Sequence, residues 1–240
     1  MYTASMAERV LDYIPDKLAE ADFFLDQMED AGRNFFAFRC FFSAFLSASR
    51  SVTLTLQAVM EGAEGFAGWY EERRKELSTE PTARFLLDLR NISIHAGDSG
   101  IIGGATHLRD DGEVVVRYYF HGTPIEAALT DAGQEPDVLS VSQQYMTLLI
   151  RIVLDWQRNF SHLIDPEIYL TARALEAKGR TIEDVEEELG FPRGWTAVLT
   201  DDPEEQLRAL RRELPPAFDL SWLTSKYLGD SDAPPAHGSS

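Results

Sequence analysis

Four long segments of this chain repeat their apolar residues at the spacing of an amphipathic helix, and this periodicity constrains the fold more than any other feature. They span about residues 5–31, 34–60, 81–96 and 137–164 of the 240 residues. Side chains three and four residues apart lie on one face of a helix, so each segment has an apolar stripe to bury. The sequence therefore predicts a mainly α fold built on an antiparallel four-helix bundle.

The third segment has clear expected ends and an expected core face. Ser78 or Thr79 can cap it, Pro81 suits its first turn, and Gly97 follows its last residue. Its predicted core stripe comprises Phe85, Leu89, Ile92 and Ala96. In the fourth segment the residues expected to point inward are Val141, Tyr145, Leu148, Leu149, Ile152, Val153 and Trp156.

A β-hairpin insertion is expected between the third and fourth helices, at about residues 101–122. Apolar and polar residues alternate there around the pair Asp111 and Gly112, which favours a tight turn. That turn would place His107 opposite Val116 rather than His121, so we expect no metal site at this hairpin. No other pattern indicates a metal or a cofactor.

The character of the chain changes beyond Pro166. Residues 1–165 form the predicted bundle domain, and residues 166–228 form a small helical appendage that is strongly acidic between 182 and 205. We expect one helix up to about Lys178, an acidic helix after Thr181 and another at about residues 203–214. The tail at residues 229–240 has the composition of a disordered segment.

Charge and cysteine content limit the classes of partner. With 22 basic and 40 acidic residues, the chain has a net charge of −18, which repels nucleic acid and anionic membranes over most of the surface. An anionic substrate therefore requires a local basic site. A single cysteine excludes an internal disulfide, and no signal peptide or transmembrane span is evident, so we expect a cytoplasmic protein.

One basic stretch stands out because residues 33–60 contain three arginines and no carboxylate. A buried helix explains the missing acids, since burying carboxylates is costly, and an anion-facing surface explains them equally. Helical spacing aligns Arg39, Ser43, Ser47 and Arg50 in one polar stripe, and the other side of this helix carries Phe38, Phe41, Phe42 and Phe45. We therefore take Arg50, Arg39 and Ser47 as candidate substrate-binding residues.

The sequence LRNISIHAG places Arg90, Asn91 and His95 in the last turns of the third helix. Asn91 and His95 are one turn apart, and Arg90 projects about 100° to the side, so the three can converge on one ligand. An imidazole can act as an acid or a base near neutral pH. The alternative interpretation is an ordinary helix end with a capping histidine and a surface arginine.

This arrangement resembles the HEPN superfamily (higher eukaryote and prokaryote nucleotide-binding). The resemblance rests on the Arg-x4-His spacing of RNISIH, on the polar residue after the arginine, and on the position of this motif near the end of the third bundle helix. The second helix, FFSAFLSASRSVTLTL, is also similar to that of the superfamily. The likeness covers roughly residues 5–96 and 137–164. Many members of that superfamily are metal-independent endoribonucleases of toxin and defence systems.

The resemblance implies that Arg90 and His95 are the catalytic pair and that Asn91 supports them. It also implies a homodimer with a composite site, no cofactor, an RNA substrate such as tRNA or mRNA, and an antitoxin protein as a further partner. DNA would be spared because it lacks the 2′-hydroxyl. The alternative is a HEPN-like dimeric module that binds a nucleotide or protein partner without cutting.

Overall fold

The computed structural model describes residues 13–96, 100–108, 112, 114–120, 137–214 and 219–229. This part of the chain is mainly helical and includes one two-stranded antiparallel sheet, which confirms the mainly α class. The described residues divide into two compact units. The larger unit contains residues 16–152 and 221–229, and the smaller contains residues 13–15 and 153–220.

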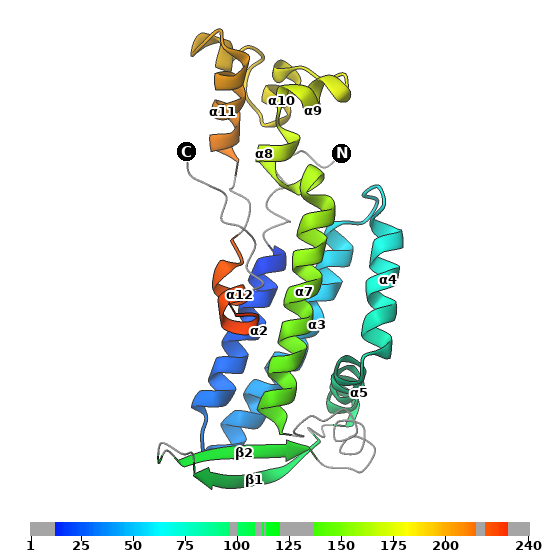
Figure 1. Ribbon diagram of the computed structural model, residues 1–240, viewed down its shortest axis with the longest axis vertical. Coiled ribbons are helices and arrows are strands. Elements are labelled where there is room, and N and C mark those ends of the chain that lie inside the picture. The colour runs from blue at the N-terminus through cyan, green and yellow to red at the C-terminus, as the bar shows by residue number, and fades with distance from the viewer. Residues whose placement is uncertain are drawn as a thin grey trace. The chain divides into compact units, whose positions relative to one another are not determined.

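Helices occupy the described parts of all four segments in which the apolar periodicity predicts them, and α4 is a further helix between two of them (Figure 1). The residues 5–12 of the first predicted helix, and the tail beyond residue 229, lie outside the described part. No described helix is long and apolar enough to cross a membrane. The long helices are α2 (Tyr13–Asp30), α3 (Phe35–Val59), α4 (Phe66–Thr79), α5 (Pro81–Ala96) and α7 (Val138–Ile164).

Local hydrogen bonds fix the starts of α3 and α5. The side chain of Asn34 accepts from the amide of Ala37 at 3.1 Å and caps α3. The predicted cap of α5 is wrong: Ser78 and Thr79 belong to α4, and their hydroxyls donate to the Lys75 carbonyl. The carboxylate of Glu80 instead accepts from the Ala83 amide at 2.6 Å, so an acid stabilises the positive end of the α5 dipole.

The predicted core faces are confirmed on α3 and only in part on α5. Phe38, Phe42 and Phe45 are buried on α3, opposite the exposed Ser43 and Ser47. On α5, Leu89 is buried but Ile92 is 49% exposed. The prediction for Ile92 is therefore wrong, because the apolar residues of α5 extend beyond the face that it buries.

The hairpin consists of β1 (Ile101–Leu108) and β2 (Val114–Phe120). Among the described residues the pairing runs as far as Leu108 with Val114, and of the expected turn at Asp111 and Gly112 the structure describes Gly112 alone. His107 faces Val115, one position from the predicted Val116. Its Nε2 lies 2.8 Å from the Tyr119 hydroxyl. Asp111 and His121 lie outside the described residues.

Aromatic side chains of β2 form part of the core of the larger unit. Phe120 is fully buried, with its ring 4.7 Å from that of Phe85 and 5.8 Å from that of Phe42. Tyr118 packs 4.3 Å from Phe38, and its hydroxyl donates to the Gly32 carbonyl at 2.9 Å, at the end of α2. The hairpin therefore joins α2, α3 and α5, and is more than a peripheral insertion.

The smaller unit contains short helices with well-formed caps, and its outline differs from the predicted appendage. Residues 170–171 interrupt the helix that was expected up to Lys178. The short helices are α8 (Pro166–Tyr169), α9 (Ala172–Ala177), α10 (Ile182–Glu188), the 3-10 helix η1 (Thr196–Val198) and α11 (Pro203–Glu213). They enclose a buried apolar cluster of Leu170, Leu175, Val185, Leu207, Leu210 and Leu214.

The last helix, α12 (Ser221–Tyr227), belongs to the larger unit, whereas the sequence places it in the appendage. The Lys226 ammonium lies 2.8 Å from the carboxylate of Asp22 and 2.5 Å from that of Asp26. The Tyr227 hydroxyl donates to Asp22 at 2.6 Å. Asp22 is buried, so these bonds to α12 supply the partners that its charge requires.

A buried carboxylate organises the turn after α10 in the smaller unit. Glu186 is fully buried and accepts hydrogen bonds from the Thr196 amide at 2.6 Å, the Thr196 hydroxyl at 2.5 Å and the Gly194 amide. Burial alone raises the pKa of Glu186, but these bonds and one from the Trp195 amide outweigh it and lower the pKa below its usual 4.5.

We expect Phe120→Ala to lower the free energy of unfolding by about 3–5 kcal/mol, because it leaves a cavity between α3 and α5. Urea denaturation followed by circular dichroism measures this loss. Leu108→Ala is the matched control, since Leu108 is on the same hairpin but 73% exposed, and should change stability by less than about 0.5 kcal/mol. Equal effects of the two substitutions would contradict the structural role of the hairpin.

We expect Glu186→Gln to destabilise the protein by about 2–3 kcal/mol at neutral pH, because the amide group opposes a backbone donor. A lowered pKa stabilises the fold above pH 4.5, and this contribution is lost as the pH falls through the lower folded-state value. Wild type should therefore lose stability more steeply with acid than Glu186→Gln. The exposed Glu183→Gln is the control, and parallel pH profiles for wild type and Glu186→Gln would refute the role of this carboxylate.

Candidate functional site

The C-terminal turns of α5 hold the predicted catalytic residues. The Arg90 Nη1 donates to the Asn91 Oδ1 at 3.4 Å, a long hydrogen bond between neighbouring side chains. Asn91 is exposed and Arg90 is half-buried, and the buried Arg90 Nε has no hydrogen-bond partner among the described residues. The helical backbone continues through position 95, whereas the side chain of His95 lies outside the described part. Arg90 and Asn91 are consecutive in the chain, and the structure adds this one hydrogen bond between their side chains.

The outer face of α5 combines polar and apolar side chains. Its exposed residues are Arg84, Leu87, Asp88, Asn91 and Ile92. At 3.6 residues per turn, positions 84, 87, 91 and 95 fall in one line along the helix. Arg84 therefore lies on the same exposed face of α5 as the predicted catalytic turns. Leu87 and Ile92 are the exposed apolar residues of this face.

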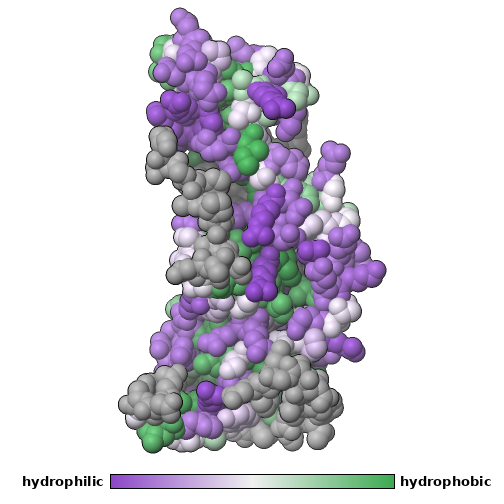
Figure 2. Space-filling view, in the orientation of Figure 1, coloured by the Kyte–Doolittle hydropathy of each residue, from purple (hydrophilic) through white to green (hydrophobic). Residues whose placement is uncertain are grey.

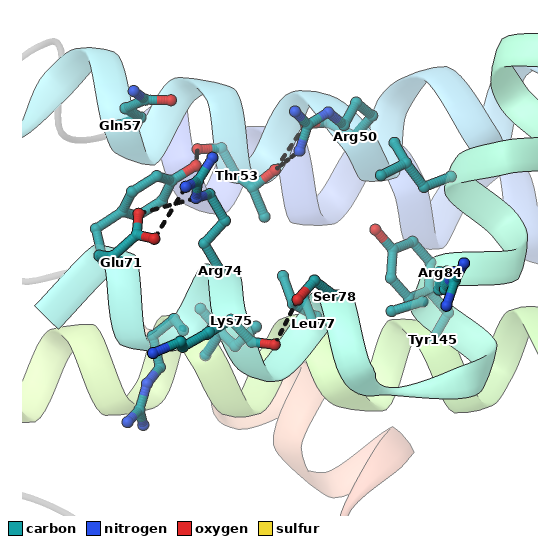
Figure 3. Close-up of a pocket in the computed structure, with 15 residues that line it drawn as sticks. Arg50, Thr53, Gln57, Glu71, Arg74, Lys75, Leu77, Ser78, Arg84 and Tyr145 are labelled. Carbon is teal, nitrogen blue, oxygen red and sulfur yellow. Dashed lines mark hydrogen bonds and ion pairs between the residues drawn. The ribbon is translucent and has the colours of Figure 1, made fainter.

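A second feature, which we call the cationic pocket, is a cavity of about 880 Å³ lined by residues of α3, α4, α5 and α7 within the larger unit (Figure 3). Its apolar lining includes Leu77, Ala83, Leu87 and Ile152. Its charged lining consists of Arg50, Glu71, Arg73, Arg74, Lys75 and Arg84. Five cations and one carboxylate thus face a single cavity in a chain of net charge −18.

The cations of the pocket differ in how they are paired. Glu71 binds Arg74 through two hydrogen bonds of 2.9 Å, and Arg73 pairs with Glu76 at 3.0 Å. Arg50, Lys75 and Arg84 have no ion-pair partner among the described residues. The Arg50 Nη1 donates to the Thr53 hydroxyl at 3.0 Å, a neutral partner that leaves its charge uncompensated.

Two tyrosines add hydroxyl groups to this surface. The Tyr70 hydroxyl donates to the Thr53 carbonyl at 3.0 Å and so attaches α4 to α3. Tyr145 is only 6% exposed, and its hydroxyl points into the cavity with no hydrogen-bond partner in the described part of the chain (Figure 3). Burial raises the pKa of Tyr145 to about 12, although nearby Arg50 opposes the shift, so the group is a neutral donor and acceptor at physiological pH.

The predicted substrate-binding residues separate in the structure. Arg50 lines the cationic pocket, whereas Arg39 and Ser47 lie elsewhere on the exposed face of α3. The Arg39 guanidinium lies 5.6 Å from the ring centre of Phe35, and the Ser47 hydroxyl donates to the Ser43 carbonyl at 3.1 Å. Arg90 and Asn91 do not line the pocket either.

Sequence reasoning missed the contributions of Arg74, Lys75 and Arg84 and the open hydroxyl of Tyr145. The run Arg73, Arg74, Lys75 was the available signal. Among the described residues no group of three or more His, Cys, Asp or Glu side chains is placed to hold a metal ion. Comparisons with protein-family models, with curated proteins and with solved structures found no match to this chain.

Proposed function

We propose that the chain is a metal-independent endoribonuclease of the toxin or defence type, with Arg90 and His95 of two copies forming one composite site. In this proposal α2, α3, α5 and α7 are the four helices of a HEPN-like bundle. The observation that carries the proposal is the placement of Arg90 and Asn91 side by side at the end of α5, where Asn91 is exposed and faces solvent together with Ile92.

The proposed chemistry assigns one role to each side chain. A base removes the proton of the RNA 2′-hydroxyl, whose oxygen attacks the adjacent phosphorus. The bond from phosphorus to the 5′-oxygen breaks, and an acid protonates that oxygen. The products are a 2′,3′-cyclic phosphate and a 5′-hydroxyl. The Arg90 guanidinium would stabilise the extra negative charge of the transition state, and Asn91 would orient the phosphate.

Two proton-transfer groups are needed, and a single His95 per site supplies one. A two-fold interface duplicates every group that it contains, so pairing the α5 ends of two copies would place two imidazoles and two guanidinium groups around one phosphodiester. The exposed Ile92 supports this proposal, because an interface at this face would remove its apolar surface from water.

The direct test is cleavage of cellular RNA by the purified full-length chain in the presence of a chelator. We expect RNA fragments ending in a 2′,3′-cyclic phosphate, no cleavage of DNA, and a loss of at least about 100-fold in rate for His95→Ala and for Arg90→Ala. Mass spectrometry of the new ends measures the product. No cleavage by wild type at any RNA concentration would reject the nuclease and favour the non-cutting binding module.

We expect Ile92→Glu to convert the dimer into a monomer and to abolish cleavage, because the interface would bury an unpaired charge. Sedimentation velocity measures the change. Ile168→Glu is the matched control, since Ile168 is similarly exposed but lies in the smaller unit, and it should stay dimeric. A dimeric, active Ile92→Glu chain would place the site elsewhere.

Subunit mixing tests the shared site without relying on a single variant. Wild type equilibrated with a threefold excess of His95→Ala should fall to roughly one quarter of its activity, because most wild-type chains then sit in dimers with one imidazole. The same excess of the monomeric Ile92→Glu chain should leave the activity unchanged. Full activity in the first mixture would show that one subunit suffices.

A further inference from the structure

We infer that the cationic pocket is a binding site for a multiply phosphorylated small molecule. This inference rests on the lining of the pocket and does not depend on the proposed RNA cleavage. It assigns the pocket a ligand separate from the phosphodiester at Arg90, because neither Arg90 nor Asn91 lines it.

Uncompensated positive charge is the first argument for an anionic ligand. Arg50 comes from α3, Lys75 from α4 and Arg84 from α5, and none of them has an ion pair among the described residues. Carboxylates outnumber cations almost two to one in this chain, so acidic side chains that could pair with these three cations are abundant in the sequence. Arg50 is half-buried and Lys75 and Arg84 are exposed, and an anion bound in the cavity would add the negative charge that this lining lacks.

The second argument is independent of charge and comes from Tyr145. Its side chain is more than nine-tenths buried, yet its hydroxyl faces the cavity without a hydrogen-bond partner in the described residues. The hydroxyl is not among the buried polar atoms that lack a partner, so it opens onto the cavity, where water or a ligand can bind it. A phosphate oxygen held by Arg50 would accept a hydrogen bond from this hydroxyl, which Figure 3 shows at the same cavity as Arg50.

The size and lining of the cavity narrow the chemical class. Cations on three helices, unpaired within the described part of the chain, match several anionic groups better than one carboxylate, and arginine forks suit phosphate oxygens. A volume of about 880 Å³ is larger than a single inorganic phosphate needs and falls in the range of organic ligand sites. Leu77, Leu87 and Ile152 offer apolar contacts for the organic part.

An RNA backbone fits these observations less well than a compact ligand. Continuous binding of a strand requires a cationic track that extends over many phosphates. The remaining chain is strongly acidic, and the five cations are gathered around one cavity. The pocket therefore favours a molecule that concentrates its charge in a small volume.

Binding should also stabilise α4, which is weakly attached. Phe66 is its one buried residue in the described structure, and Figure 2 shows hydrophilic side chains over this helix. Its position depends in part on the hydrogen bond from Tyr70 to α3. A ligand that contacts residues of α4 together with Arg50 or Arg84 would link α4 to α3 or α5, so binding should raise the melting temperature.

Isothermal titration calorimetry at constant ionic strength tests the inference on the full chain, with sodium tripolyphosphate and fructose 1,6-bisphosphate as probes. We expect saturable binding of at least one probe, and no saturable binding of sulfate. Arg50→Gln should weaken binding at least tenfold and Tyr145→Phe several-fold, with unchanged circular dichroism. The exposed Arg212→Gln is the control for loss of one positive charge and should bind like wild type.

Three results would overturn the inference. The first is the absence of saturable binding of both probes up to millimolar concentration. The second is equal affinity in wild type, Arg50→Gln and Tyr145→Phe, which would mean nonspecific binding. The third is displacement of the probe by a uridine hexanucleotide with the same dependence on Arg50, measured in a His95→Ala chain, which would assign the pocket to RNA. Retained probe binding by that His95→Ala chain separates this site from the proposed nuclease.

Discussion

The burial of one face of α3 is the constraint on which the larger unit depends. Phe38 and Phe42 on that face contact the aromatic residues of β2, and Thr53 accepts the hydrogen bond that attaches α4. A carboxylate on this face would have to be desolvated, which explains why the buried face of α3 carries none. The hairpin, α4 and α5 all take their positions from this one helix.

The same constraint determines the electrostatics of the larger unit. Because α3 carries no acids, Arg50 has no carboxylate on its own helix to neutralise it. The neighbouring helices contribute Lys75 and Arg84 rather than a counter-ion, and Glu71 is already bound to Arg74. A helix without acids thus contributes to a basic cavity in an acidic protein. The explanation by burial holds for the inner face of α3, and the anion-facing surface stays a prediction.

Local sequence patterns were sufficient to predict most of the helices and strands. They failed where tertiary packing determines which side chains are buried. Helical periodicity located α2, α3, α5 and α7, and the alternation of residues located the hairpin. It misplaced Ile92, because the pattern shows which residues are apolar but not how wide a face the neighbouring elements cover. Helical spacing also predicted correctly that Tyr145 points inward. Whether such a side chain contacts a neighbour or a cavity depends on the position of α4, which the spacing does not give.

The cationic pocket was beyond sequence reasoning for a related reason. Its three uncompensated cations come from three helices and are separated by up to 34 positions along the chain. No single motif contains them. Arg90 and Asn91 could be proposed from the sequence because they are adjacent in it, whereas residues of a cavity that is assembled from several helices share no local pattern.

The central claim, that the α5 ends of two copies meet, is tested most directly by pulsed electron paramagnetic resonance. A spin label on Asp88→Cys, one turn before Ile92 on the exposed face of α5, would report the distance between copies, with the exposed Cys40 replaced by serine. The account predicts a short intersubunit distance at position 88 and a clearly longer one for a label at Glu72 on α4. A monomeric chain, or labels at position 88 that lie farther apart than those at position 72, would contradict it.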